Sequence, residues 1–358
     1  MADEIKNSVD EKKVPVLELK DLVVHYETQD GVAEAVNGIS FEVYPAETLG
    51  LVGETGAGKT TIALTTMGLL PDAGHVIDGE ILLDGEVITT TSRKKSDKKK
   101  LNAKLRAHRG GTMGMIFQDP MSALNPVKYV GDQIAEVVLL HNKVSKADAK
   151  ARAIEMMETV GIPGERYSEY PHQFSGGMKQ RIVIAMALAC NPRLLIADEP
   201  TTALDVTIQA QVLELMNQLQ KKFHTATLMI THDLGVVAEV CDKVAVIYAG
   251  EVVEYGTVEH IFNNPQHPYT MALFNALPSL DKDVERLNSI EGLVTDPMNL
   301  PTYCSFCERC PEKKDICSIV DPTTSEIEPG HIAKCVKFMK QEDIDAILKA
   351  KAEEGEVK

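Results

Sequence analysis

The sequence of 358 residues contains no long apolar run. A helix that crosses a bilayer needs about 18 or more consecutive apolar residues, whereas the best candidate, Ile182 to Ala189, is soon followed by Pro192 and Arg193. The charged first fifteen residues also lack the apolar core of a secretory signal. We therefore expect a cytosolic chain without a membrane span of its own.

Basic residues are outnumbered by acidic ones. The 37 Lys and Arg against 53 Asp and Glu give a formal net charge of −16, which disfavours duplex binding because phosphate contacts normally come from a basic patch. The one dense basic run, Arg93 to Lys104, lies in a Ser, Thr and Lys-rich stretch, and we interpret it as a solvated loop. No nucleic-acid partner is expected.

Disulfides are not expected either, because a cytosolic setting keeps thiols reduced. Seven cysteines need another explanation, and five of them crowd into the last sixth of the chain: Cys304, Cys307, Cys310, Cys317 and Cys335. Thiolates this close either share a metal or remain reduced thiols, and we favour a metal. The spacing suits a [4Fe–4S] cluster held by four cysteines, although zinc accepts the same ligands.

The chain alternates between strand and helix patterns. Val16 to Val24 and Ile39 to Val43 predict an antiparallel sheet with one wet face. Buried parallel strands are predicted at Glu47 to Gly53, Thr112 to Phe117, Arg193 to Asp198 and Thr227 to Thr231, and helices at Asp132 to Leu140, Lys146 to Val160 and Val206 to Phe223. This alternation predicts an α/β fold with a parallel core.

The length predicts about two domains. We expect a disordered N-terminus at 1–13, a main domain at 14–280 with an inserted helical subdomain at about 119–180, a Cys-bearing C-terminal domain at 281–340 and a charged helical tail at 341–358. The boundary near residue 280 follows from a change in sequence pattern, because a segment with three prolines is followed by one with weak hydrophobic periodicity.

The strongest motif is the run from Gly53 to Thr60, which has the G-x-x-x-x-G-K-[ST] pattern of a phosphate loop. Its glycines let backbone N–H groups turn toward phosphates, while Lys59 reaches the β- and γ-phosphates and the Thr60 hydroxyl binds Mg²⁺. The predicted nucleotide contacts are Gly53, Glu54, Thr55, Gly56, Ala57, Gly58, Lys59, Thr60 and Thr61.

A second motif closes a buried strand with two acids. We expect Asp198 to hold Mg²⁺ and Glu199 to polarise the attacking water, which together with the phosphate loop indicates nucleotide hydrolysis.

The run FSGGMKQR, Phe174 to Arg181, resembles the signature sequence of ATP-binding cassette (ABC) ATPases. The resemblance implies a head-to-tail dimer in which the signature of one cassette closes over the ATP on the phosphate loop of another. The implied signature contacts are Phe174, Ser175, Gly176, Gly177 and Met178. It also implies a RecA-like core, an antiparallel β subdomain and an inserted helical signature subdomain.

Four further positions match the family in the expected order. By this resemblance Tyr26 stacks on adenine, Gln118 senses the γ-phosphate and Mg²⁺, Asp205 belongs to the dimer-contact loop and His232 is the switch histidine. Met178 departs from the general pattern, which has Gln there, and so does Ala46, where a Gly is usual.

Met178 points to the dipeptide and oligopeptide importer subfamily, whose nickel-importing relatives look similar. The chain resembles it over about residues 15–338, in YPHQ, FQDPMSALNPV, TTALDVTIQAQVLELM, HPYT and the Cys-rich C-terminus. Some members carry a [4Fe–4S] cluster on the positions of Cys304, Cys310, Cys317 and Cys335. Cys307 is a surplus thiol that could replace a neighbour, stay free or mark a shifted ligand set.

The resemblance implies a cytosolic ATPase subunit, using ATP and Mg²⁺, that powers peptide import. Its partners would be a second cassette, usually a different chain, two transmembrane permease subunits and, indirectly, an extracytoplasmic solute-binding protein. It would lie at the cytoplasmic face of the membrane. The same machinery importing nickel or another small solute stays open, and a soluble DNA-repair ABC ATPase is disfavoured by the compact cassette and acidic charge.

Overall fold

The computed structural model describes residues 14–119, 123–202, 204–276 and 290–354. The expected disordered N-terminus and the expected boundary near residue 280 lie outside these residues.

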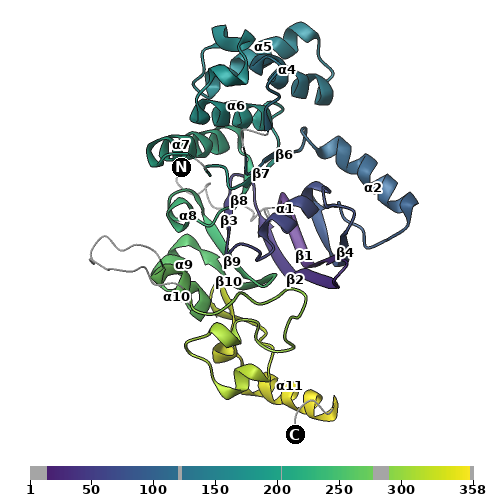
Figure 1. Cartoon of the computed structure of the whole chain (residues 1–358), viewed down its shortest axis with the longest axis vertical. Helices are drawn as coiled ribbons and strands as arrows, with labels where there is room; N and C mark the ends of the chain where they lie inside the picture. The colour runs from purple at the N-terminus through teal and green to yellow at the C-terminus, as the bar shows by residue number, and fades with distance from the viewer. Residues whose placement is uncertain (1–13, 120–122, 203, 277–289, 355–358) are drawn as a thin grey trace, which may run out of the picture.

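An antiparallel sheet forms the first layer (Figure 1). Its strand order is β2 (Val32–Val43), β1 (Leu17–Glu27), β4 (Gly74–Leu83) and β5 (Glu86–Val87). Leu17, Leu19 and Leu22 are buried on β1, while charged residues such as Lys20 and Asp21 are exposed. The predicted antiparallel sheet with one wet face is confirmed.

The second sheet has eight strands and crosses the middle of the molecule. Its order is β11 (Thr324–Glu328), β12 (His331–Lys334), β10 (Glu251–Thr257), β9 (Lys243–Tyr248), β3 (Thr48–Val52), β8 (Ala226–Ile230), β7 (Leu194–Asp198) and β6 (Met113–Ile116). The five strands from β9 to β6 are parallel. β3, β7 and β8 are buried along their whole lengths, which explains their continuous apolar runs. The four predicted parallel strands are therefore confirmed.

Helices pack beside this sheet. They are α1 (Lys59–Met67), α7 (Val206–Phe223), α8 (Leu234–Val240), α9 (Val258–Asn263) and α10 (Pro268–Asn275). In α7 the apolar stripe of Val212, Met216 and Leu219 is buried, as its periodicity predicts.

A helical subdomain lies at one end of the molecule (Figure 1). It contains α4 (Val130–His141), α5 (Lys146–Thr159) and α6 (Gly176–Leu188). Ser145 caps α5 by accepting a hydrogen bond from the Asp148 amide, which satisfies one of the free N–H groups of the first turn. These helices share a core with the outer parallel strands through Ile116, Leu195 and Ala197.

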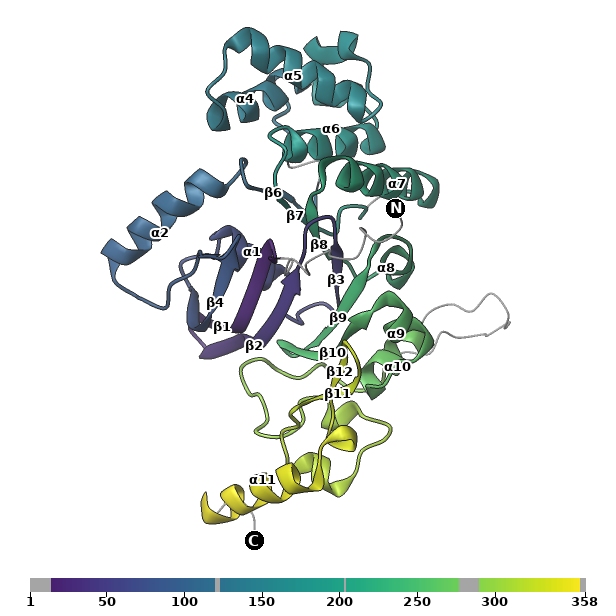
Figure 2. The same ribbon diagram turned by 180° about the vertical axis from the view of Figure 1, so that it is seen from behind.

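The basic run predicted to be a loop is a helix, α2 (Lys95–His108), that stands beside the antiparallel sheet (Figure 2). The loop prediction is wrong because Leu101 and Leu105 share one helical face and pack on the core. Its lysines Lys98, Lys99 and Lys100 are exposed, so the run is solvated as expected.

The cysteine-bearing region is joined to the large sheet. β12 pairs with β10, placing Ala333 opposite Glu254 and Ile332 opposite Tyr255. His331 Nε2 lies 2.8 Å from Glu254 Oε1, and both side chains are fully buried. The C-terminal α11 (Gln341–Glu354) is predominantly polar. None of the described helices combines the length and the apolar character needed to cross a membrane.

Candidate functional site

The phosphate loop connects β3 to α1. Gly58 has φ +100°, a backbone conformation that side chains rarely adopt, and a Cβ there would lie 2.3 Å from the Ala35 carbonyl oxygen. A Cβ on Gly53 would lie 2.1 Å from the Ile247 carbonyl oxygen. Only glycine fits at these two positions, as the motif predicts.

The loop closes around the ammonium group of Lys59. Lys59 Nζ donates hydrogen bonds to the carbonyl oxygens of Gly53 (2.7 Å) and Glu54 (2.9 Å). Burial lowers the pKa of Lys59, against the charges of Glu199, Asp198 and Glu54, which favour its protonated form. A cation held inside a ring of backbone groups is suited to a phosphate chain.

Thr60 and Asp198 place two oxygen atoms side by side. The Thr60 hydroxyl donates to Asp198 Oδ1 over 3.5 Å, and Asp198 ends β7 with a residue exposure of 4%. Burial raises the pKa of Asp198, although the hydrogen bond from Thr60 opposes this. Hydroxyl and carboxylate oxygens are the ligands that Mg²⁺ prefers, so the residues fit the predicted metal site.

Glu199 is the centre of a hydrogen-bonded group that joins three segments. Its Oε2 accepts from Gln118 Nε2 and Thr202 Oγ1, both at 3.0 Å, and its Oε1 lies 3.0 Å from His232 Nδ1. Glu199 itself has φ +47°, a backbone conformation that is uncommon for residues other than glycine. The structure therefore brings the predicted catalytic residues Glu199, Gln118 and His232 together.

The electrostatics of Glu199 favour a carboxylate. Burial alone would raise its pKa, but the hydrogen bonds from His232, Thr202 and Gln118 together hold it below the usual value. An ionised carboxylate can accept a proton from water at neutral pH.

Tyr26 lies near the start of α1. Its hydroxyl donates to Thr61 Oγ1 over 3.3 Å. This hydrogen bond links Tyr26 to α1, the helix that follows the phosphate loop. The predicted stacking on adenine stays a prediction.

The signature begins a different helix, α6, in the helical subdomain (Figure 1). Phe174 is buried, and the Ser175 hydroxyl accepts from the Met178 amide over 3.4 Å. A Cβ on Gly177 would lie 2.4 Å from Ile208 Cγ2, so this glycine allows α6 to approach α7. The signature therefore lies on the helical subdomain, whereas the phosphate loop lies between β3 and α1.

Asp205 caps α7 by accepting from the Ile208 amide at 3.0 Å. Of the neighbouring TTALD segment, Ala203 lies outside the described residues. The dimer-contact role of Asp205 stays a prediction.

Two residues that the sequence analysis missed contact the phosphate loop through Glu54. The Glu54 amide donates to Tyr269 Oη at 2.9 Å, and the Glu54 carboxylate pairs with Arg309. Burial raises the pKa of the Tyr269 hydroxyl, which keeps it neutral. Tyr269 belongs to the HPYT segment and Arg309 to the cysteine run, so motif recognition marked both neighbourhoods without assigning either residue.

The C-terminal cysteines occupy one neighbourhood. Burial raises the pKa of Cys304 to about 12 and that of Cys310 to about 11, and nearby Cys335 and Cys317 add to both shifts. Cys307 is fully buried, with Sγ 3.4 Å from Ser318 Oγ.

In the part of the chain that the structure describes, no three of these thiols have sulfurs within 4.8 Å of one another. The one three-residue group of the described chain whose ligand atoms lie within 4.8 Å of one another consists of His260, Glu328 and His331. A tetrahedral zinc with Zn–S bonds of about 2.3 Å requires sulfurs about 3.8 Å apart. The metal expected at these cysteines stays a prediction.

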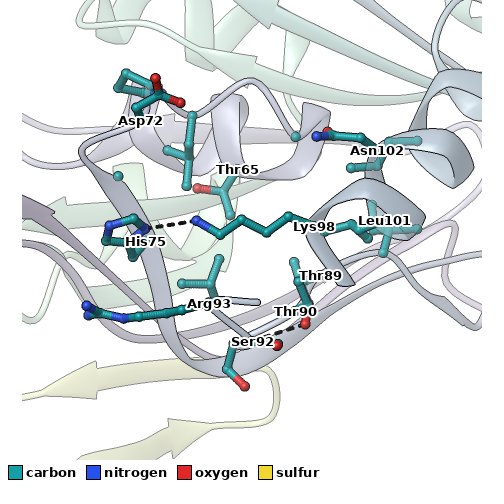
Figure 3. A pocket seen from close by; sticks show the side chains of 18 residues that line it. Thr65, Asp72, His75, Thr89, Thr90, Ser92, Arg93, Lys98, Leu101 and Asn102 are labelled. Carbon is teal, nitrogen blue, oxygen red and sulfur yellow. Dashed lines mark hydrogen bonds between the residues drawn. The ribbon is translucent and has the colours of Figure 1, made fainter. Parts of the chain in front are cut away.

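A cavity of about 190 Å³ lies elsewhere, beside α2 (Figure 3). Its wall includes Thr65, His75 and Lys98, with Lys98 Nζ 3.5 Å from His75 Nδ1. It contains none of the predicted nucleotide contacts and is smaller than typical ligand pockets of about 300–1,000 Å³. The candidate site is the surface around the phosphate loop and Glu199, where the hydrogen-bonded groups described above lie.

Comparison with known families agrees with this site. Residues 36–202 match the model of the ABC transporter family, and residues 253–317 match that of the oligopeptide/dipeptide transporter C-terminal region. The first match contains the phosphate loop, signature and Glu199, and the second ends at Cys317.

Characterised relatives are similar over most of the chain. The dipeptide transport ATP-binding protein DppD of Bacillus subtilis is 48% identical over 323 residues, covering 89% of this chain and 94% of the relative. The oligopeptide transport ATP-binding protein OppD of Escherichia coli is 47% identical, covering 90% and 93%. The solved structure of cbiO1 from Clostridium perfringens, part of the ABC transporter complex cbiONQ, has 28% identity and a TM-score of 0.59, covering 70% and 91%.

Proposed function

The chain belongs to the ATP-binding proteins of dipeptide and oligopeptide ABC transporters, and on this premise we propose that it hydrolyses ATP to power the import of peptides. The observation that carries the proposal is the group of Glu199, Gln118 and His232 at the end of the parallel strands, next to Thr60, Asp198 and Lys59. This group combines a base with the residues that hold phosphate and metal.

Each residue has a distinct task in hydrolysis. Glu199 orients the attacking water and accepts its proton, because it is ionised and lies among hydrogen-bond donors. Lys59 and the loop amides neutralise charge that develops on the phosphates. Gln118 and His232 contact Glu199 directly, so their positions couple the γ-phosphate to the base.

Magnesium completes this site. Thr60 and Asp198 would hold the ion, with Gln118 nearby, and when bound it would neutralise charge on the phosphate oxygens. Tyr26 would support adenine.

The active unit is a head-to-tail pair of cassettes. Phe174, Ser175, Gly176, Gly177 and Met178 would contact ATP held on the partner, where the free amides at the start of α6 suit a γ-phosphate. Asp205 would lie at the contact between the two. The partner is a second ATP-binding subunit of a different sequence.

Membrane subunits would convert this motion into transport. Two permease subunits bind the cassettes at the cytoplasmic face, and an extracytoplasmic binding protein delivers solute without touching this chain. ATP binding closes the pair and hydrolysis lets it open, which drives alternating access.

The test of cargo is uptake into proteoliposomes that contain the chain with its permease partners, second cassette and binding protein. We expect ATP-dependent uptake of labelled di- or oligopeptides and no uptake of nickel. Nickel uptake without peptide uptake would overturn the peptide assignment, and a Lys59→Ala variant would distinguish uptake powered by this subunit from leakage.

We also propose that Cys304, Cys310, Cys317 and Cys335 hold a [4Fe–4S] cluster, with Cys307 able to substitute for a neighbour. The grouping of half-buried thiols supports this, because Cys335 and Cys317 both lie close enough to Cys304 and Cys310 to raise their pKa values. When bound, such a cluster would join the segments that carry these four cysteines through its iron–thiolate bonds.

Metal analysis tests the cluster. Protein purified without oxygen is expected to contain about four irons per chain and to show a broad absorption band near about 400 nm, both of which are typical of a [4Fe–4S] cluster held by four cysteines. Cys317→Ser should lower the iron content, whereas Cys190→Ser, far along the chain, should not. Zinc without iron would contradict the assignment.

A further inference from the structure

Arg309 makes a two-pronged ion pair with the phosphate loop. Its Nη1 lies 2.6 Å from Glu54 Oε2 and its Nη2 lies 3.0 Å from Glu54 Oε1, although the two residues are 255 positions apart in the chain. The Arg309 side chain is only 4% exposed and that of Glu54 26%. Parallel N–H···O bonds of this kind combine strength with a defined orientation.

Arg309 is itself held firmly. Its guanidinium also donates to the carbonyl oxygens of Glu291 (3.1 Å) and Ile290 (3.3 Å) and to Tyr248 Oη (3.5 Å). These contacts use the remaining donors of the fork, so the group has one orientation. The segment that carries Arg309 therefore presents a fixed positive charge to Glu54.

Glu54 is fixed at three points. Its carboxylate meets Arg309, its amide donates to Tyr269, and its carbonyl accepts from Lys59. Arg309 and Tyr269 both come from the chain that follows the parallel core. The conformation of the phosphate loop thus depends on the C-terminal region.

An aromatic cluster packs beside the Arg309–Glu54 ion pair, because Tyr248 contacts Arg309 and Tyr269 contacts Glu54. The rings of Tyr248 and Tyr269 have centroids 4.7 Å apart, and Phe306 lies 5.2 Å from the first and 5.3 Å from the second. All three side chains are fully buried. Phe306 lies between Cys304 and Cys307, so this packing connects the cysteine run to the phosphate loop.

We propose that Arg309 is a positioning residue of the ATP site, which neutralises and orients Glu54 and thereby links ATP affinity to the folded state of the cysteine-bearing segment. The inference rests on the proposed function in one respect, that this loop binds ATP. Without Arg309, the Glu54 carboxylate would lie uncompensated beside the triphosphate, and like charges disfavour binding.

A double-mutant cycle on the full chain tests the proposal. Binding of a fluorescent ATP analogue is measured for wild type, Arg309→Gln, Glu54→Gln and the double variant. We expect Arg309→Gln to raise Kd roughly tenfold, because one unit charge is left unpaired near the phosphates. In the Glu54→Gln background the same change should have an effect below about threefold.

Two further variants separate positioning from folding. Arg309→Lys keeps the positive charge but loses the paired guanidinium donors that bind both carboxylate oxygens. Its Kd for the ATP analogue should lie between those of wild type and Arg309→Gln. Arg193→Gln is the matched control, because Arg193 is exposed and pairs with Asp84 at 3.0 Å; its Kd should equal that of wild type.

The link to the cysteine segment has its own readout. Cys310→Ser, next to Arg309, should weaken binding of the analogue, and this effect should shrink when Glu54 is Gln. An equally large loss in both backgrounds would show general damage and overturn the link.

The outcomes distinguish this inference from the proposed function. If wild type does not bind the analogue, the proposed function fails. If wild type binds and Arg309→Gln binds equally well, or if the loss is the same with Gln at position 54, the positioning role is wrong while the function stands.

Discussion

Replacing Glu199 by Gln exchanges one carboxylate oxygen for an NH₂ group and leaves the size of the side chain almost unchanged. The remaining oxygen can still accept from Gln118 and Thr202, while the new amide can donate to His232 Nδ1, so the three contacts of Glu199 are preserved. We expect the variant to fold and to bind ATP as wild type does. The variant loses the negative charge of the carboxylate and with it the ability to accept a proton.

The size of the effect follows from that single loss. General base catalysis contributes about 10²- to 10⁴-fold, so kcat for ATP hydrolysis should fall by roughly that factor in the assembled transporter, with little change in nucleotide affinity. Phosphate release and binding of a fluorescent ATP analogue measure the two quantities separately.

The matched control is Glu214→Gln, an exposed acid on α7 whose carboxylate accepts from Gln218. It should hydrolyse ATP at the wild-type rate. A Glu199→Gln transporter that also did so would refute the assignment of Glu199 as the base.

Two more predictions concern the phosphate loop and stability. Gly58→Ala should abolish binding of the ATP analogue, because its Cβ would lie 2.3 Å from the Ala35 carbonyl oxygen; wild-type affinity would show that the loop is not held as described. His267 is fully buried, and burial lowers its pKa from 6.5 to about 3. Between these values the unfolded chain binds a proton that the folded chain does not, so stability falls as pH drops below about 6.5, by about 2 kcal/mol at pH 5. His267→Asn, which keeps an acceptor for the Tyr269 amide, should lose less stability between pH 7 and pH 5 in urea unfolding, and an unchanged loss would contradict this source.

Local patterns predicted most of the central fold. The apolar runs of β3, β7 and β8 are readable because both faces of these strands are buried. The range of α7 matches the prediction from Val206 to Phe223 because its apolar stripe recurs with the helical period. The phosphate loop is equally local, since its spacing alone specifies the turn.

Features that depend on distant pairing were not predicted. β12 spans only His331–Lys334. Its place in the sheet depends on pairing with β10, where Ala333 lies opposite Glu254. Such pairing is set by tertiary context more than by local propensity. Hydrophobic periodicity also did not identify α2, because only two leucines, Leu101 and Leu105, mark its core-facing side among many lysines. The contacts of Glu54 with Tyr269 and Arg309 likewise come from tertiary packing.

The candidate site shows the same division. Gln118, Glu199 and His232 were expected from the order of their motifs, and the structure brings them within hydrogen-bond distance. Thr202 was not expected, although its hydroxyl completes the set of donors to Glu199. Its signal was available, because it follows Glu199 by three residues in the segment after β7.

The most direct test of the central claim is the ATP hydrolysis rate of the reconstituted transporter with and without peptide-loaded binding protein. If this chain powers peptide import, the rate per complex should rise when the loaded binding protein is added, and the rise should disappear with Glu199→Gln. A hydrolysis rate that is the same with and without peptide would contradict the claim.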